Sequence, residues 1–167
     1  MIKYIFILLI GFLLPVTTGC TDTNLTHDIP LVPRPAHLVP GSGNYLFSDK
    51  TVFVVENEEQ AAVAASLISR FTNAAGFTPK LVVGATEKGD VRFVTDASLK
   101  SEAYSLEVSP EEIIVKASGD KGFFYALQTI RQLLPASIER ESLSDKKEKW
   151  SIPAMNVQDE PRFEYRA

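Results

Sequence analysis

The chain has 167 residues, of which 45% are hydrophobic and 23% are charged, and its formal net charge is −4. This size and composition are typical of one globular domain with an additional segment. The acidic balance, without a basic patch interleaved with aromatic residues, argues against nucleic acid as a partner.

The first nineteen residues have the pattern of an export signal. Lys3 supplies the positive charge and residues 4–14 form an apolar run of about eleven residues, which is too short for the roughly 20 residues that span a bilayer. We therefore predict a cleaved signal peptide at residues 1–19. Its removal takes away one of 17 basic residues and none of the 21 acidic ones, so the mature charge is 16 − 21 = −5.

Cys20 is the only cysteine in the chain and directly follows Gly19. This position resembles a bacterial lipobox, in which the thiol is acylated and the protein is anchored to a membrane. Thr17 departs from the usual aliphatic residue, so cleavage without lipidation stays open, as does a lone buried cysteine. We expect a lipidated Cys20, a tether at residues 20–28, and an exported lipoprotein in the periplasm or on the cell surface.

The next segment, residues 21 to about 44, contains Pro30, Pro33, Pro35 and Pro40. Proline fixes φ and restricts the residue before it to extended geometry. An ordered extended arm is predicted there. Residues 51–55 have the β-branched and aromatic composition of a buried strand. Asn57 and Gln60 then have the spacing of a helix N-cap, and apolar residues recur at helical spacing until Gly76.

Two helices with strands between them predict an α+β fold, a β-sheet with two helices packed on one face. Asp120 is the expected cap of the second helix, which Pro135 ends. Residues 136–149 are charged and aperiodic, so a loop is expected. The remaining strands are predicted at residues 80–83 and 91–94, and in a hairpin of residues 104–108 and 113–117.

Few residues suggest a metal or cofactor site. His27 and His37 are the only histidines and neither has a second ligand at helical spacing, so we expect no zinc and no other metal or cofactor. Gly84 and Gly89 have the outer spacing of a phosphate loop, but Asp90 stands where lysine is needed. This segment is interpreted as a turn.

Three acidic pairs remain as candidates for acid–base chemistry. Glycosidases use two carboxylates across a pocket, one of them kept protonated by burial. The pair at residues 58–59 opens a helix and the pair at 111–112 lies in a hairpin turn, where solvent exposure explains them. The third pair is Asp159 and Glu160. From the residues alone, no catalytic machinery is visible.

Three segments, in their order and spacing, resemble the start of glycoside hydrolase family 20, the β-N-acetylhexosaminidases. Residues 29–35 (IPLVPRP) are similar to the entry into the non-catalytic N-terminal domain of that family, and residues 122–134 (GFFYALQTIRQLL) to its last helix. The third segment combines residues 150–153 (WSIP), 157–159 (VQD) and 161–166 (PRFEYR).

The resemblance implies an N-terminal α+β domain at residues 29–149 and, at residues 150–167, the first strand of a (β/α)8 catalytic barrel that is otherwise missing. Arg166 falls where the family has an arginine that binds sugar hydroxyls, a role that suits the fixed donors of guanidinium. Ala167 stands where glycine is common. The catalytic Asp-Glu pair would lie beyond Ala167, so this chain should contain no catalytic residue and be inactive alone.

The family's retaining, substrate-assisted chemistry acts on amino-sugar glycans, which we expect to be bound through the missing barrel, while this domain packs against it. A second hypothesis is a self-contained module that binds glycans or a partner without cleaving them. In that hypothesis exposed aromatic side chains would stack on sugar rings, the candidates being Tyr45, Trp150, Phe163 and Tyr165.

Overall fold

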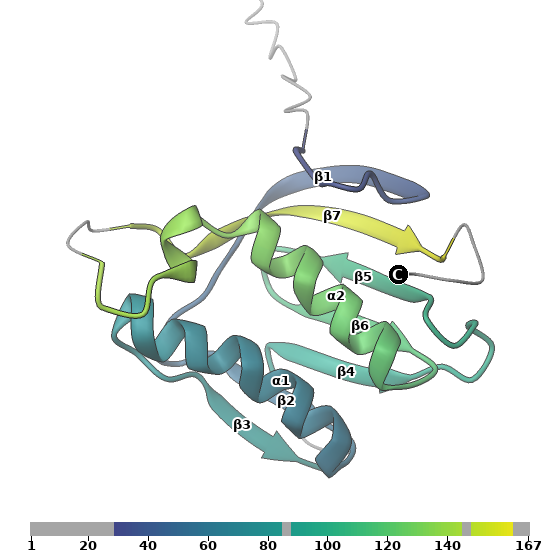
Figure 1. The fold of residues 1–167 in the computed structure, drawn as a ribbon, viewed down its shortest axis with the longest axis horizontal. Helices are drawn as coiled ribbons and strands as arrows, with labels where there is room; N and C mark the ends of the chain where they lie inside the picture. The colour runs from purple at the N-terminus through teal and green to yellow at the C-terminus, as the bar shows by residue number, and fades with distance from the viewer. Residues whose placement is uncertain (1–28, 85–87, 145–147, 162–167) are drawn as a thin grey trace, which may run out of the picture.

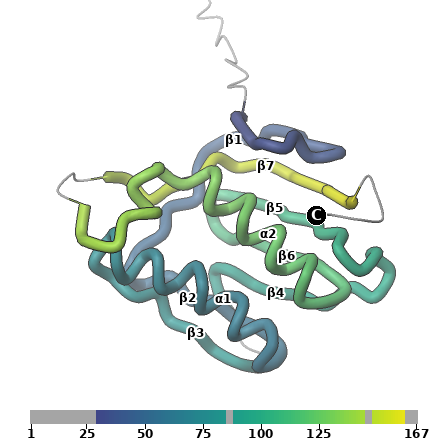
Figure 2. The backbone as a smooth tube through the Cα atoms, viewed as in Figure 1, coloured from purple at the N-terminus to yellow at the C-terminus, as the bar shows by residue number. Residues whose placement is uncertain are grey.

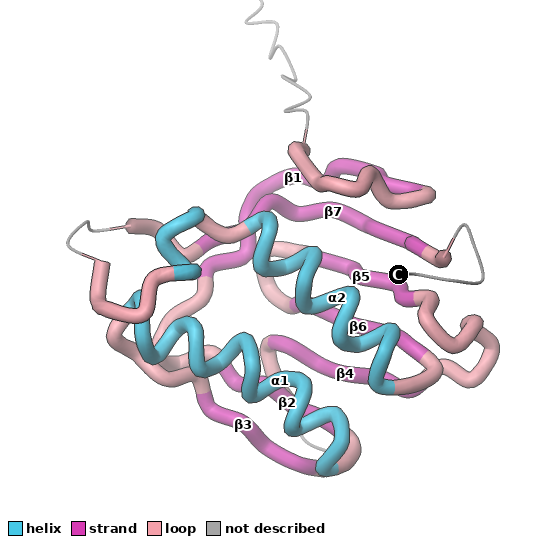
Figure 3. The backbone as a smooth tube through the Cα atoms, in the orientation of Figure 1, coloured by secondary structure: helices cyan, strands magenta, loops and turns pink. Residues whose placement is uncertain are grey.

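The computed structural model describes residues 29–84, 88–144 and 148–161, which form one mixed sheet with helices on one face (Figures 1 and 3). The helices are α1 (Glu58–Arg70) and α2 (Asp120–Leu133), followed by a π-helical turn at Phe71–Ala75 and a 3-10 turn at Ala136–Glu139. The strands are β1 (His37–Leu46), β2 (Val52–Val55), β3 (Lys80–Val83), β4 (Val91–Thr95), β5 (Tyr104–Val108), β6 (Ile113–Ala117) and β7 (Ser151–Asp159). The predicted α+β class is confirmed.

The seven strands lie in the order β1-β7-β5-β6-β4-β2-β3. The half that contains β3, β2, β4 and β6 is parallel, and α1 makes the crossover from β2 to β3. The half that contains β6, β5, β7 and β1 is antiparallel. The predicted hairpin of β5 and β6 and the three other predicted strands, which are β2, β3 and β4, are confirmed.

The last strand corrects the expected domain boundary. β7 pairs with β1 on one side and with β5 on the other, so residues 151–159 lie inside this sheet. The prediction that the domain ends at residue 149 and that a barrel strand begins at Trp150 is therefore wrong. The physical reason is that β1 and β5 would each leave a row of unpaired backbone groups without β7 between them.

β1 is the second strand that the sequence did not predict. The sequence predicts an extended arm here but no strand, whereas residues 37–46 form an edge strand whose register shifts between Pro40 and Asn44. Proline is tolerated at an edge because the ladder does not need its missing N–H. Gly43 has a φ of 90°, a left-handed conformation that glycine adopts without strain.

The two helices begin differently. Asn57 Oδ1 accepts a hydrogen bond from the backbone N of Gln60 at 2.9 Å, as predicted for α1. The Gln60 side chain is buried and donates to Thr95 Oγ1 at 3.0 Å, which joins α1 to β4. The predicted cap of α2 is wrong: Gly119 is the N-cap and Asp120 is the first helical residue.

The core lies between the sheet and the helices, and aromatic rings fill its end near β1. Phe71 lies 4.8 Å from Phe47 and 6.3 Å from Trp150 between ring centroids, and Phe47 lies 4.8 Å from Tyr45. At the other end, Phe93 and Phe123 stack at 5.1 Å. The residue that precedes β7 is thus a core residue of this domain.

Gly122 allows α2 to approach the sheet. A Cβ at this position would lie 2.4 Å from the carbonyl oxygen of Ala103 and 2.7 Å from Ala117 Cβ. Gly119, three residues earlier, has an extended φ of −174° and nothing within 4 Å of a built Cβ.

We predict that Gly122→Ser lowers the free energy of unfolding by about 1 to 3 kcal/mol, because the added atoms must displace backbone. Gly119→Ser is the matched control and should be neutral or slightly stabilising, since serine can cap the helix. Urea unfolding followed by circular dichroism measures both. Equal destabilisation by the two variants would contradict the packing argument.

Glu139 joins the C-terminal ends of both helices. Its carboxylate accepts from Arg131 Nη2 at 2.7 Å and Nε at 3.0 Å, and lies 3.3 Å from Arg70 Nη1. The hydrogen bonds from Arg131, helped by the positive charges of Arg131 and Arg70, hold the pKa of Glu139 below its ordinary value of 4.5. Because this pKa is lowered in the folded state, the ionised carboxylate stabilises the fold at pH values above its ordinary pKa.

This contribution should be lost as the pH falls through the folded-state pKa of Glu139, below about 4.5. Glu139→Gln should therefore lower the free energy of unfolding at pH 7 by less than about 1 kcal/mol, because the carboxylate is half-exposed. The variant should also lose less of this free energy than the wild type as the pH falls from 7 to 3. Unfolding free energies between pH 3 and pH 7 test this. The exposed Glu141→Gln is the control, and an unchanged acid-side slope in Glu139→Gln would contradict the assignment.

Candidate functional site

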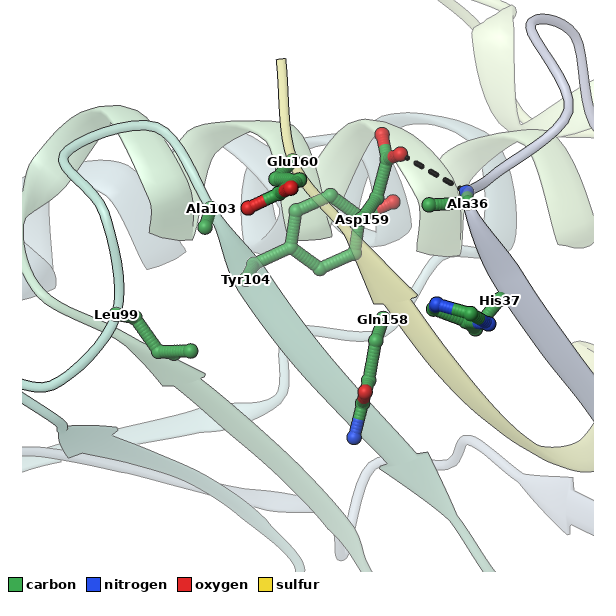
Figure 4. Close-up of a pocket in the computed structure, with 8 residues that line it drawn as sticks. All are labelled: Ala36, His37, Leu99, Ala103, Tyr104, Gln158, Asp159 and Glu160. Atoms are coloured by element: carbon green, nitrogen blue, oxygen red, sulfur yellow. Dashed lines mark hydrogen bonds between the residues drawn. The ribbon is translucent and has the colours of Figure 1, made fainter. Parts of the chain in front are cut away.

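The most evident cavity lies at the end of β7, where the chain leaves the sheet (Figure 4). Its volume is about 320 Å³. The start of β1, the loop before β5 and the last residues of β7 contribute its walls, namely Ala36, His37, Leu99, Ala103, Tyr104, Gln158, Asp159 and Glu160.

Asp159 occupies the end of β7, opposite Tyr104 of β5. Its Oδ1 accepts a hydrogen bond from the backbone N of Ala36 at 3.1 Å, drawn as the dashed line in Figure 4. The tyrosine below it is buried, and its hydroxyl lies 2.6 Å from Thr129 Oγ1 of α2. The carboxylate therefore holds the arm against the end of the sheet.

Glu160 is exposed to solvent, which makes it a poor candidate for a general acid. Lys100 Nζ lies 2.9 Å from its Oε2, and the two side chains are 71% and 51% exposed. A general acid in a glycosidase must be kept protonated by burial, whereas this carboxylate is half-exposed and paired with a lysine. In this structure the Asp159 carboxylate contacts the Ala36 amide and the Glu160 carboxylate contacts Lys100.

The other acidic pairs are also surface groups. Glu58 and Glu59 are exposed in the first turn of α1, where their negative charge interacts favourably with the helix dipole. Glu112 lies in the turn between β5 and β6, with Arg92 Nη2 3.0 Å from its Oε2. Glu112 lines a second pocket together with Glu107, but both carboxylates are partly exposed and ion-paired, to Arg92 and Lys116 respectively.

His37 begins β1 at the rim of the cavity and is exposed. Among the residues that the structure describes, no three His, Cys, Asp or Glu side chains could hold a metal ion together. Asp90, which argued against a phosphate loop, accepts a hydrogen bond from the backbone N of Val52 at 2.8 Å. Its role in the described part of the loop is thus structural.

Two residues predicted to carry function lie outside the described residues. Arg166, expected to bind sugar, and Cys20, expected to be lipidated, therefore stay predictions. His27 is outside as well. In residues 29–84, 88–144 and 148–161, no helix has the length and apolar character needed to cross a bilayer.

The aromatic residues proposed to stack on sugar rings divide in the same way. Tyr45 is 4% exposed and Trp150 is 8% exposed, so both are core residues and present no face to a ligand. Phe163 and Tyr165 lie outside the described residues. The binding-module hypothesis loses two of its four named contacts.

The sequence did not reveal the side chains that hold the arm. Gln132 Oε1 of α2 accepts from the backbone N of Val32 at 3.0 Å, and Asp159 accepts from Ala36. These partners are separated by 100 and 123 residues in the chain. No local periodicity could indicate them, although the proline-rich composition correctly predicted an extended segment.

A family model described as glycosyl hydrolase family 20, domain 2, matches residues 28–160. The matched range includes β7 in full, in agreement with the sheet. It thus supports the corrected boundary independently of the strand pairing.

Individual relatives lead to the same family. A β-hexosaminidase of Porphyromonas gingivalis is 28% identical over 141 residues, covering 83% of this chain and 18% of that protein. An N,N'-diacetylchitobiase of Vibrio harveyi is 27% identical over 144 residues, covering 81% and 14%. The solved N-acetyl-β-hexosaminidase of Streptomyces plicatus is 27% identical with a TM-score of 0.71, over 79% of this chain and 26% of that one. The chain thus spans a minor part of these relatives.

Because Trp150 packs on Phe71 in the core, we predict that Trp150→Ala lowers the free energy of unfolding by about 3 to 5 kcal/mol. Val39→Ala, at a side chain 61% exposed, should change it by less than about 0.5 kcal/mol. Urea unfolding of both variants decides the point. A fully stable Trp150→Ala variant that had lost binding to an amino-sugar polymer would instead support the binding-module hypothesis.

Proposed function

The chain belongs to glycosyl hydrolase family 20, and we propose from this that it is the N-terminal, non-catalytic part of a β-N-acetylhexosaminidase. The complete enzyme would remove terminal N-acetylhexosamine residues from glycans with retention of configuration, the substrate's own acetamido group acting as nucleophile. The observation that carries the proposal is the family match over residues 28–160, together with the names of the relatives.

The described residues support a structural role for this part. Their acidic side chains form ion pairs, turns and helix starts, and none of the three pairs is a buried carboxylate facing a second one. Hydrolysis would thus depend on carboxylates supplied by another part of the enzyme. In this proposal the 167-residue chain is inactive when tested alone.

We further propose that the catalytic domain packs against the helices. Beyond the acidic first turn, the outward side of α1 is formed by small exposed residues, namely Ala62, Ala65, Ser66 and Ser69. On α2, Phe124 is 47% exposed and its ring lies 5.6 Å from that of Tyr125. Small side chains permit close approach and an exposed aromatic ring favours an interface.

The opposite face of the sheet has a different character. Lys116 Nζ lies 2.7 Å from Glu107 Oε1 across β6 and β5, and Arg92 of β4 pairs with Glu112. Both pairs are partly exposed, which suits a surface in water. The contrast between the faces supports the helix side as the contact with the remainder of the enzyme.

Export and anchoring complete the proposal. The signal-like residues 1–19 and Cys20 would place the enzyme outside the cytoplasm, anchored by acyl chains in the periplasm or on the cell surface. Amino-sugar glycans would be its substrates there. Labelling with a palmitate analogue, lost in Cys20→Ser, tests the anchor.

The test of the enzymatic proposal is to express the complete reading frame and assay it on a chromogenic N-acetyl-β-glucosaminide. We expect cleavage with retention of configuration by nuclear magnetic resonance, and no cleavage by the 167-residue chain under the same conditions. A complete protein that cleaves neither N-acetylglucosaminides nor N-acetylgalactosaminides would overturn the proposal.

The proposed contact surface yields a separate prediction. Phe124→Glu should leave the 167-residue chain about as stable as wild type, because the ring is half-exposed, but should lower the melting temperature of the complete protein by burying a charge at the interface. Val39→Glu is the control, since Val39 is 61% exposed on an edge strand. Calorimetry of both proteins measures this, and equal shifts for the two variants would exclude the helix face.

A further inference from the structure

The residues at the end of β7 restrict the direction in which the chain leaves the sheet. Asp159 pairs with Tyr104 in the ladder and accepts from the amide of Ala36. Glu160 pairs with Lys100 and precedes Pro161, so its backbone is biased toward extended geometry. Pro161 fixes its own φ. Three successive residues are thus constrained where a flexible linker would otherwise stand.

The arm reaches this point as a strap, which we define as residues 31–36. Its first end is held by the hydrogen bond from Val32 N to Gln132 and by the buried side chain of Leu31. Its second end is held by the hydrogen bond from Ala36 N to Asp159. The strap then continues into β1, which lies beside β7 in Figure 2. The first residue of β1, His37, pairs with Gln158 of β7.

Asp159 is the group that joins the strap to the exit. An amide that donates to an ionised carboxylate forms a stronger hydrogen bond than one between neutral groups. The neighbouring pair of Lys100 and Glu160 is largely exposed, and such pairs contribute little. Of the two side-chain contacts at the exit, that of the Asp159 carboxylate is therefore the stronger.

We propose that Asp159 is a positioning residue that sets the orientation of the catalytic domain relative to this domain. The inference rests on the proposed function, because it requires a catalytic domain after β7. Domains joined by a free linker move relative to one another by default. Because the strap holds the point where the chain leaves the sheet, it would limit that motion and fix the orientation of the catalytic domain.

The experiment uses the complete protein and three variants. In Asp159→Ala the link to Ala36 is lost, whereas in Asp159→Asn the amide oxygen can still accept from the same N–H. Asp96→Ala is the matched control, because Asp96 Oδ1 accepts from the amide of Ser98 at 2.9 Å within its own turn. It removes the same chemical group without touching the strap.

We expect Asp159→Ala to lower kcat/KM on a chromogenic N-acetylglucosaminide roughly tenfold, since small misplacements far from the reacting atoms reduce rates strongly. Asp159→Asn should restore it to within about twofold, and Asp96→Ala should leave both kcat and KM unchanged. Small-angle scattering should show a larger radius of gyration for Asp159→Ala alone. Calorimetry verifies that each variant is folded at the assay temperature.

Unchanged kinetics and scattering in Asp159→Ala would overturn the inference, as would an equal loss in Asp96→Ala, which would indicate general destabilisation. Failure of Asp159→Asn to restore both readouts would also count against it. A wild-type protein without hexosaminidase activity would overturn the proposed function instead. In that case scattering alone still decides whether Asp159 fixes the arrangement of the domains.

Discussion

β7 enters the sheet between β1 and β5, and its pairing on both sides completes the domain. His37 of β1 meets Gln158 only after the whole intervening chain has folded back, so β1 has no partner until β7 is in place. The same insertion brings Trp150 onto Phe71 and carries Asp159 to the strap. The aromatic core, the edge strand β1 and the point where the chain leaves the sheet therefore all depend on β7. Its pairing with β1 closes a long loop, and this contact must offset the loss of chain entropy.

In the proposed enzyme, the position of β7 would let this domain act on the catalytic part without supplying catalytic residues itself. Because the chain leaves the sheet at a constrained point, this domain can determine where the following residues begin. Its helix face, formed by small residues along α1 beyond the first turn, differs from the ion-paired outer face of the sheet. One face suits contact with protein and the other suits contact with water.

Much of the fold could be predicted because local patterns record which face of an element is buried. The helical spacing that ends at Gly76, the Asn57 cap and the β5–β6 hairpin all follow from neighbouring residues. The cap of α2 was predicted wrongly because Asp120 and Gly119 are adjacent and the backbone geometry at Gly119 decided between them. The resemblance over residues 150–166 indicated the correct family but placed its boundary before β7 rather than after it.

By itself, the sequence determined the two helices, the short strands β2 to β6 and the family. Tertiary structure alone decided that β1 and β7 are neighbours, that Tyr45 and Trp150 are core residues, and that Ala36 lies against Asp159. The difference has one physical cause. Side-chain periodicity specifies the buried face of a segment, whereas its neighbour is set by backbone pairing and packing between residues far apart in the chain. Ala36 and Asp159, for example, are separated by 123 residues.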